Sequence, residues 1–103
     1  MSVTYVIKFQ IAPGKHDDFV ALLTGVLDAM RHESTFVEAM LHADPDDVNR
    51  LMLYETWQDH DDVVNVQVHR PYRQAFHEAL PTLLAAPRDI SIWRCLRADR
   101  STK

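Results

Sequence analysis

The amino-acid sequence predicts an α+β domain of the order β-α-β-β-α-β, a ferredoxin-like subunit with helices on one face of an antiparallel four-stranded sheet. Three observations support this prediction. Segments in which apolar residues alternate, as in strands, occur four times along the chain. Segments with apolar residues at helical spacing follow the first and third of them. One polar loop joins the second and third strands, as in an antiparallel hairpin.

The first part of the chain supplies a strand and a helix. Residues 2–12 alternate between apolar and polar side chains, which is typical of a strand. Asp17 and Asp18 then suit the first turn of a helix, where the helix dipole favours negative charge. Apolar residues recur at helical spacing after them, so this helix is expected over residues 15–32.

The second and third strands are expected over residues 35–41 and 50–57. The segment between them, residues 42–49, is rich in residues that favour turns. Because two strand-like segments flank one polar connection, the sequence predicts a hairpin with a long loop.

The segment after the third strand carries conflicting signals. Asp59, with Asp62 three residues later, indicates a helix start with Asp in place of the usual Glu or Gln of a capping box. Residues 63–68 are rich in valine and alternate, which favours a strand. The cap and the short distance to the next helix favour one or two helical turns, so a short helix is predicted.

Pro71 opens the last predicted helix, because proline suits the first helical position, where its missing N–H would be unpaired anyway. Pro81 is expected to end or kink this helix, and the fourth strand is expected over residues 89–96. The apolar face of the helix comprises Tyr72, Ala75, Phe76, Ala79 and Leu80. The residues expected to face solvent are Arg73, Gln74, His77 and Glu78.

The predicted sheet is apolar on both faces. Val6 interrupts the polar side of the first strand, Met52 lies between two leucines, and Trp93 follows an isoleucine in the fourth strand. The helices cover only one face, so the other would remain an exposed apolar surface. A second copy of the same sheet is the simplest cover, which predicts a homodimer paired through its sheet faces.

Length and composition predict one domain over residues 1–97, followed by a polar C-terminal tail over residues 98–103. The formal net charge of −4 argues against nucleic acid as a partner. No apolar stretch approaches the roughly 20 residues that span a bilayer, and no signal peptide is recognisable, so no membrane partner and a cytoplasmic location are expected. The single cysteine, Cys95, is expected to be a small buried hydrophobe.

No cofactor or metal site is predicted. The chain contains six histidines, but none is paired at the i, i+4 spacing of ligands on one helix, and no His-x-His occurs. The only glycines, Gly14 and Gly25, form no phosphate-binding loop.

One stretch of the chain is similar to a family signature. The third strand ends in Tyr54-Glu55-Thr56-Trp57 with Asp59 two residues further on, and Pro71-Tyr72 opens the next helix with Phe76 one turn on. Together with the turn at residues 13–15 and the loop at residues 44–47, these features resemble the antibiotic biosynthesis monooxygenase-like family over almost the whole chain. The resemblance implies a ferredoxin-like subunit that pairs into a dimeric α/β barrel. The Glu-x-Trp-x-Asp element points to the family and to no particular reaction.

The chain also departs from patterns found within that family. Members usually have a histidine in the middle of the short helix, and the nearest imidazole here is His69. Some oxygenase members have an asparagine four residues before the tryptophan, where this chain has Leu53. Haem-degrading relatives use Asn, Trp and His at places that align with Ile7, Val66 and Phe76, which argues against haem degradation.

A substrate pocket is predicted at the start of the last helix. If the short helix continues toward the proline, His69, Tyr72 and Phe76 share one face and Trp57 closes the same pocket. His69 is the predicted catalytic base, because a neutral imidazole can take a proton from a phenolic or enolic substrate. The predicted substrate-binding residues are Trp57, Tyr72, Phe76 and Glu55.

Each of these residues also has a purely structural interpretation. Trp57, Tyr72 and Phe76 suit an ordinary core, and His69 suits a loop or the start of a helix. Glu55 is the polar member of an apolar strand, which leaves open a buried acid or an ion-pair partner of an arginine such as Arg94.

Three functions stay open at this point. The first, implied by the resemblance, is a cofactor-independent monooxygenase acting on a small aromatic, quinol or polyketide-like substrate, whose anion gives an electron to O2 in a dry cavity. The second is a non-enzymatic dimeric module for ligand binding or assembly. The third is an isomerase or lyase acting on a small enolisable acid. Fold alone does not choose among them.

Overall fold

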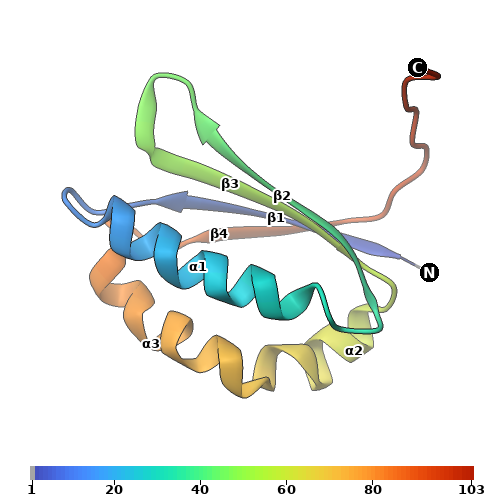
Figure 1. The fold of residues 1–103 in the computed structure, drawn as a ribbon, viewed down its shortest axis with the longest axis horizontal. Helices are drawn as coiled ribbons and strands as arrows, with labels where there is room; N and C mark the ends of the chain where they lie inside the picture. Colours follow the sequence, from blue (N-terminus) through green and yellow to red (C-terminus); the bar gives the residue numbers. More distant parts are fainter. Residues whose placement is uncertain (1) are drawn as a thin grey trace.

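The computed structural model describes residues 2–103 and has two layers (Figure 1). A four-stranded sheet forms one layer, and the helices lie together over one of its faces. The strands are β1 (Val3–Gln10), β2 (Phe36–Asp44), β3 (Asp47–Trp57) and β4 (Asp89–Trp93). The helices are α1 (His16–Met30), α2 (His60–Asn65) and α3 (Gln74–Leu83), and two short 3-10 helices, η1 (Gln67–His69) and η2 (Pro71–Arg73), join α2 to α3.

The sheet has the strand order β2-β3-β1-β4, and every neighbouring pair is antiparallel. This order confirms the predicted ferredoxin-like fold, because β1 and β3 lie at the centre and the helical connections cross one face. Alternation along β1 decides what faces the helices. Tyr5, Ile7 and Phe9 are buried under them, whereas Lys8 and Gln10 are exposed on the other face.

The hairpin between β2 and β3 differs from the prediction. Residues 42–49 are mostly paired strand rather than loop, because β2 extends to Asp44 and β3 begins at Asp47. Oδ1 of Asp44 accepts a hydrogen bond from the backbone N–H of Asp46 at 2.8 Å, and Oδ2 accepts one from Nη1 of Arg50 at 2.9 Å. Such bonds between an aspartate and the nearby backbone close a tight turn, so fewer residues are needed to reverse the chain.

The segment after β3 is helical, as its cap predicts. Asp59 caps α2 by accepting a hydrogen bond from the backbone N–H of Asp61 at 3.1 Å. Oδ2 of Asp62 accepts hydrogen bonds from Oγ1 of Thr35 at 2.8 Å and from Nε2 of Gln67 at 3.1 Å. These bonds fasten α2 and η1 to the start of β2, which outweighs the strand preference of the valines.

Pro71 begins η2, and α3 continues past Pro81 as far as Leu83 rather than stopping at the proline. The end of α3 is fixed to β1 by backbone hydrogen bonds. The carbonyl of Leu83 accepts from the N–H of Ala12 at 2.8 Å, and the carbonyl of Gln10 accepts from the N–H of Ala85 at 2.8 Å. These contacts hold the segment between α3 and β4 against the sheet.

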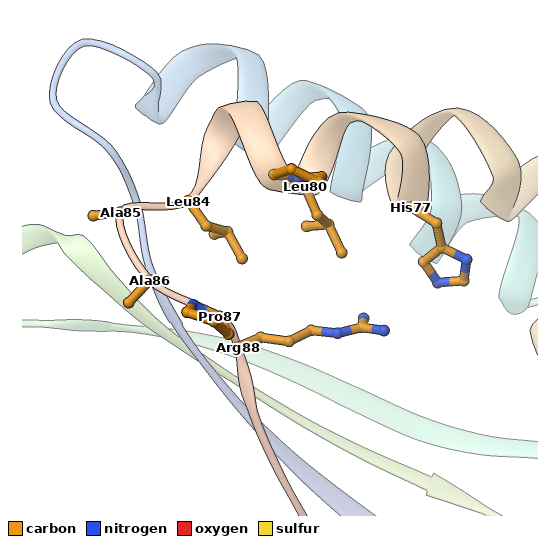
Figure 2. Close-up of a pocket in the computed structure, with 8 residues that line it drawn as sticks. His77, Leu80, Leu84, Ala85, Ala86, Pro87 and Arg88 are labelled. Atoms are coloured by element: carbon orange, nitrogen blue, oxygen red, sulfur yellow. The ribbon is translucent and has the colours of Figure 1, made fainter.

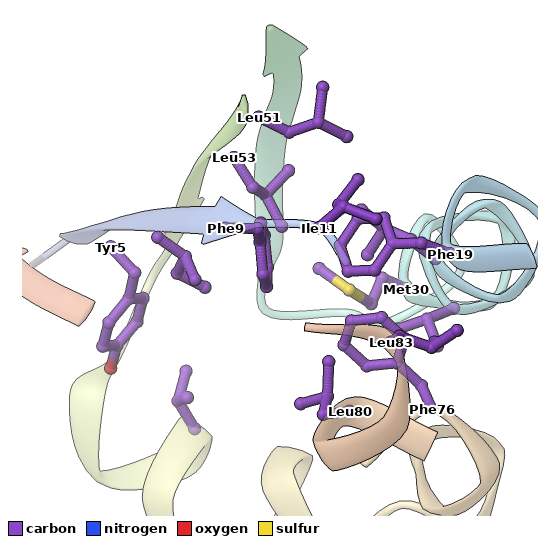
Figure 3. Close-up of a cluster of buried hydrophobic side chains, with 14 of the residues drawn as sticks. Tyr5, Phe9, Ile11, Phe19, Met30, Leu51, Leu53, Phe76, Leu80 and Leu83 are labelled. Carbon is purple, nitrogen blue, oxygen red and sulfur yellow. The ribbon is translucent and has the colours of Figure 1, made fainter. Parts of the chain in front are cut away.

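The hydrophobic core lies between the sheet and the helices (Figure 3). The rings of Phe9, Phe19 and Phe76 pack together, with centroids 4.9, 5.7 and 6.4 Å apart. Trp57 is fully buried and meets the ring of Phe36 edge-on at 5.2 Å. Aromatic pairs of this geometry add to the free energy of burial and fix α1 and α3 on the sheet.

The opposite face of the sheet has no helix over it. Val6, Met52 and Tyr54 lie on this outer face and are half-buried, while Met40 and Trp93 are 46% and 59% exposed. The sheet therefore has the second apolar face that the sequence predicted.

The fourth strand is shorter than predicted. It ends at Trp93, whose partner Thr4 lies next to the first residue of β1, so the ladder has no further strand to pair with. Cys95 lies beyond this end and is exposed, so the expectation of a buried cysteine is wrong. Residues 94–103 form no helix or strand and extend away from the two layers (Figure 1). Within residues 2–103, no helix has the length and apolarity needed to span a membrane.

Candidate functional site

A cleft opens between α3 and the segment that leads into β4 (Figure 2). Its volume of about 500 Å³ is in the range of pockets that hold small organic ligands. Its walls are mostly apolar and are formed by Leu80, Pro81, Leu84, Ala85, Ala86 and Pro87. His77 and the guanidinium of Arg88 lie close together at one end of the cleft. The volume and lining therefore suit a small, mainly apolar molecule with one polar edge.

A smaller chamber of about 30 Å³ lies deeper, between the sheet and the helices. His77 and Arg88 line both spaces, so the cleft and the chamber adjoin at these two side chains. Polar groups enter the chamber from Glu55 on β3 and Arg73 on η2. The remaining lining is apolar and comes from Ile7, Phe9, Leu23, Val26, Met30, Leu53 and Phe76.

Arg73 is only 8% exposed, so the prediction that it faces solvent is wrong. It belongs to the 3-10 helix η2, which has three residues per turn, so the α-helical spacing places it on the wrong side. Its guanidinium carbon lies 5.6 Å from the centroid of the Trp57 ring, which is a cation–π contact. Among the described residues, its Nε and Nη2 have no hydrogen-bond partner. Unpartnered buried donors of this kind are rare and indicate a place for a ligand.

Glu55 is buried opposite these donors and lies on the inner face of β3. Its Oε1 accepts a hydrogen bond from Nε1 of Trp57 at 3.2 Å. Burial raises the pKa of Glu55 above its usual 4.5, although Arg73, the Trp57 hydrogen bond and Arg88 each act in the other direction. Within residues 2–103, no ion pair at 4.0 Å or less joins Glu55 to an arginine. The site therefore favours a neutral carboxylic acid, and Glu55 is a buried acid rather than a partner of Arg94.

His77 and Arg88 control the junction between the cleft and the chamber. His77 is half-buried, so the prediction that it faces solvent is wrong. It follows Phe76 at the edge of the apolar face of α3, where the side chain of Arg88 extends beneath the helix toward it (Figure 2). Burial lowers the pKa of His77 below its usual 6.5, and the charges of Arg88 and Arg73 lower it further. The imidazole is therefore neutral near pH 7 and able to accept a proton.

The structure brings some of the predicted site residues together and leaves others apart. Glu55 and Phe76 line the chamber, and Trp57 contacts both Glu55 and Arg73 at its far side. Tyr72 is half-buried, and its hydroxyl donates a hydrogen bond to Oε2 of Glu33 at 2.9 Å, which ties η2 to the end of α1. His69 lies at the end of η1 with an exposed side chain. The structure does not place it beside Trp57 in one buried cavity.

Sequence reasoning missed Arg73, His77 and Arg88. Arg73 and His77 were assigned to a solvent face because one continuous α-helix was assumed from Pro71 onward. A signal for Arg88 was present, since it lies between a proline and the first residue of β4, where the chain passes close to the sheet. Within residues 2–103, no group of three or more His, Cys, Asp or Glu side chains is placed to hold a metal ion.

Comparison with known proteins assigns the family. A family model described as antibiotic biosynthesis monooxygenase matches residues 2–79. The chain belongs to this family, which confirms the resemblance found in the sequence. The structure of SnoaB, a cofactor-independent oxygenase from Streptomyces nogalater, has a TM-score of 0.80 to this chain at 20% identity and covers 94% of this chain and 95% of its own. At that identity the likeness shows the shared fold.

Two relatives match by sequence. A protein of Pestalotiopsis microspora that carries the name "Putative monooxygenase" is 30% identical over 95 residues, which cover 89% of this chain and 78% of that protein. An uncharacterized protein of Synechocystis sp. is 26% identical over 87 residues, which cover 84% of this chain. The match spans only 58% of the Synechocystis protein's own length.

Proposed function

We propose that the protein is a cofactor-independent monooxygenase that acts on a small phenolic or enolisable aromatic compound, such as a quinol or a polyketide-like ring system. The observation that carries this proposal is the junction of His77 and Arg88, where a neutral imidazole and a cation meet an apolar cleft. Membership of the family and the shared fold with SnoaB, which is described as a cofactor-independent oxygenase, support it.

The substrate ring lies in the cleft between α3 and the segment before β4, with its acidic oxygen or carbon toward His77. His77 takes the proton, since its lowered pKa leaves the ring nitrogen free to accept one. The guanidinium groups of Arg88 and Arg73 then stabilise the substrate anion. Fixed positive groups in a site shielded from water stabilise a developing anion far more than the same groups do in bulk water.

The substrate anion supplies the electrons for the reaction with O2. It gives one electron to O2, and the resulting substrate radical and superoxide combine to form a carbon–oxygen bond. The protein needs to supply a base, positive charge and a cavity with little water, which prevents side reactions of the intermediates. In this proposal His77 supplies the base, Arg88 and Arg73 supply the positive charge, and the apolar walls together with the bound ring keep water away.

The base is assigned to His77 in place of His69 because of where the two side chains lie. His77 lines both the cleft and the chamber, whereas His69 is exposed on η1. The oxygen-uptake experiment below also tests the role of base that the sequence predicted for His69. Of the substrate-binding residues predicted from the sequence, Glu55 and Phe76 belong to the proposed site as part of the chamber wall, and Trp57 adjoins it through its hydrogen bond to Glu55. Tyr72 bonds to Glu33 and lines neither the cleft nor the chamber.

We further propose that two copies of the chain pair through the outer face of the sheet in the cytoplasm. The exposed Met40 and Trp93 and the half-buried Val6, Met52 and Tyr54 give that face several apolar side chains on all four strands. A two-fold pair covers such a surface with its own copy, and this arrangement gives the dimeric α/β barrel that the family resemblance implies.

Oxygen uptake tests the proposed activity. The wild type, H77Q and H69Q are mixed with a panel of quinols and hydroxy-anthrones, and O2 consumption and product formation are followed. We expect turnover by the wild type, a loss of about 100-fold or more in H77Q, as for removal of a general base, and little change in H69Q.

Each other outcome has a distinct meaning. A loss confined to H69Q returns the base to the position that the sequence predicted. Equal rates in all three proteins exclude both histidines as the base. Absence of uptake with every compound contradicts the oxygenase, and saturable binding of the same compounds without uptake would instead indicate a ligand-binding module.

A further inference from the structure

We propose that the inner chamber binds the oxygen-derived anion of the reaction, with Arg73 as its hydrogen-bond donor and Glu55 as the acid that protonates it. This inference deepens the proposed function and rests on it for the reaction. The anion site itself can be tested without turnover. The proposal gives Glu55, which lines the chamber, a part in proton transfer.

The donor is provided by Arg73. The residue is more than nine-tenths buried, lines the chamber, and leaves Nε and Nη2 without a hydrogen-bond partner in the described part of the chain. A buried guanidinium keeps its charge, so it needs a negative group or a set of acceptors nearby. The Trp57 ring meets one side of the guanidinium, and Glu55 lies too far for a direct ion pair. A small anion in the chamber would supply acceptors for Nε and Nη2.

The sizes of the two spaces divide the reactants between them. The cleft, at about 500 Å³, is large enough for an aromatic ring system, whereas the chamber, at about 30 Å³, is not. A water molecule takes about 30 Å³ of liquid volume, so the chamber accommodates a group of one or two heavy atoms. In the proposed arrangement a peroxide group attached to a ring in the cleft extends into the chamber beside His77 and Arg88, which line both spaces.

Glu55 is suited to act as the acid. It lies in the chamber with Arg73, and its burial favours the protonated carboxyl group. The hydrogen bond from Nε1 of Trp57 to Oε1 holds one carboxyl oxygen. That bond leaves the other oxygen to carry the proton. A carboxylic acid whose pKa is raised by burial can donate a proton to an anion at the same site.

The proposed step is a proton transfer and changes no oxidation state. After the carbon–oxygen bond forms, the substrate is R–O–O⁻ with its negative charge on the terminal oxygen. The O–H bond of Glu55 breaks, and its proton joins that oxygen to give R–O–O–H and a carboxylate. His77, which holds the proton taken from the substrate, returns it to Glu55, so both groups recover their starting forms. The sum of these steps is R–H + O2 → R–O–O–H. Where the reactive carbon carries a second hydrogen, loss of water from the hydroperoxide leaves a carbonyl group with one of the two oxygen atoms, as a monooxygenase requires.

Azide binding tests the chamber without any substrate. Azide is a small linear anion, and Trp57 reports on it because its ring lies 5.6 Å from the Arg73 guanidinium carbon. The chain has two tryptophans, so the W93F background makes Trp57 the only one. We expect a saturable change in Trp57 fluorescence and a dissociation constant at least about tenfold higher in R73Q, the effect of losing one charged hydrogen bond.

Three further variants locate the anion. R97Q is the matched control, because Arg97 lies on the exposed tail, paired with Asp99 at 2.9 Å, and it should bind azide as the background does. If R88Q binds azide more weakly than the background and R73Q does not, the anion lies in the outer cleft, and the proposal is overturned. E55Q keeps the shape and the acceptor for Trp57, and should bind azide at least as tightly as the background at pH 8. Weaker binding by E55Q would contradict the arrangement, even if R73Q does not fold.

Turnover tests the role of Glu55 as the acid. With a substrate that the wild type oxidises, E55Q should lower kcat by about 100-fold with little change in KM, as expected for a general acid. It should also release more H2O2 per O2 consumed. A peroxide anion that is not protonated can break its carbon–oxygen bond to regenerate the substrate radical and superoxide, and two superoxide ions with two protons give H2O2 and O2. Unchanged kcat and H2O2 yield in E55Q overturn this role while leaving the oxygenase intact. If the wild type consumes no O2, the proposed function fails, and the azide titration still decides whether the chamber is an anion site.

Discussion

Each face of the sheet carries some side chains that are more usual on the opposite kind of face. The face under the helices encloses the ionisable side chains of Glu55 and Arg73, whereas the bare face exposes Met40 and Trp93. Buried ionisable groups without direct partners lower stability, and a bare apolar face promotes association. A fold retains such features where they serve a function, so the difference separates a reaction site on the inner face from a binding surface on the outer face.

The largest expected difference lies between the two tryptophans. Trp57 is 0% exposed on the inner face, and Trp93 is 59% exposed on the outer face. W57A should lower the free energy of unfolding by about 3–5 kcal/mol, because it leaves a cavity in the core. W93A should lower it by about 1 kcal/mol or less in the isolated subunit. Urea unfolding at low protein concentration measures both, and similar losses would contradict the assignment of the two faces.

A charge placed on the outer face should break the dimer. M40K puts an ammonium group into the apolar surface, and burying it unpaired should cost about 2–3 kcal/mol, which is about 30- to 150-fold in the dimer dissociation constant. V64K on α2 is the matched control, because Val64 and Met40 are both 46% exposed and Val64 lies on the helical side. Sedimentation velocity over a range of concentrations measures the effect. If M40K raises the dimer dissociation constant no more than V64K does, the two copies do not pair through this face.

The pH dependence of the reaction should report the two inner groups. His77 acts as the unprotonated base and its pKa lies below 6.5, so kcat/KM should rise through that region and level off near pH 7. Glu55 acts as the protonated acid and its pKa lies above 4.5, so kcat/KM should fall when it ionises at higher pH. Steady-state rates across pH measure both limbs. E55Q should remove the alkaline limb only, and an unchanged alkaline limb in E55Q would assign it to another group.

The smallest expected effect is that of Glu55 on how the stability of the folded chain depends on pH. Burial raises the pKa of Glu55 in the folded chain above 4.5, so its contribution is complete below that pH and is lost as the pH rises through the folded pKa. His77, with a lowered pKa, affects stability only below about 6.5, where it makes stability rise with pH. His77 is present in both proteins, so the melting temperature of the wild type should decline more steeply than that of E55Q as the pH rises above 4.5. Parallel curves would mean that Glu55 ionises in the folded protein as easily as in the unfolded chain.

The sequence was sufficient for the fold because each layer has its own periodicity. Alternation over residues 2–12, helical spacing over residues 15–32 and the proline at position 71 each match an observed element. The hairpin was harder, because most of the turn-forming residues 42–49 lie in the two strands, and only residues 45 and 46 form the turn, which the Asp44 side chain closes. Propensity describes local preference, and the side-chain bonds across the turn outweighed it.

The candidate site was predicted only in part. Glu55 and Trp57 could be found because a polar residue in an apolar strand and a tryptophan at its end are local features. Arg73 could not, because its burial depends on a 3-10 turn before α3. His77 and Arg88 come together only once the segment after α3 folds back against the sheet. His69 was favoured by its spacing from Tyr72, which assumed a continuous helix where the chain instead forms two separate 3-10 turns.

The most direct test of the account is a crystal structure of the protein grown without oxygen in the presence of a hydroxy-anthrone or quinol that it binds. We expect the ring between α3 and the segment before β4, with its reactive carbon facing the opening between His77 and Arg88. We also expect the chamber beside Glu55 and Arg73 to stay free of the ring. A ligand seated beside His69 or on the outer face of the sheet would contradict the account.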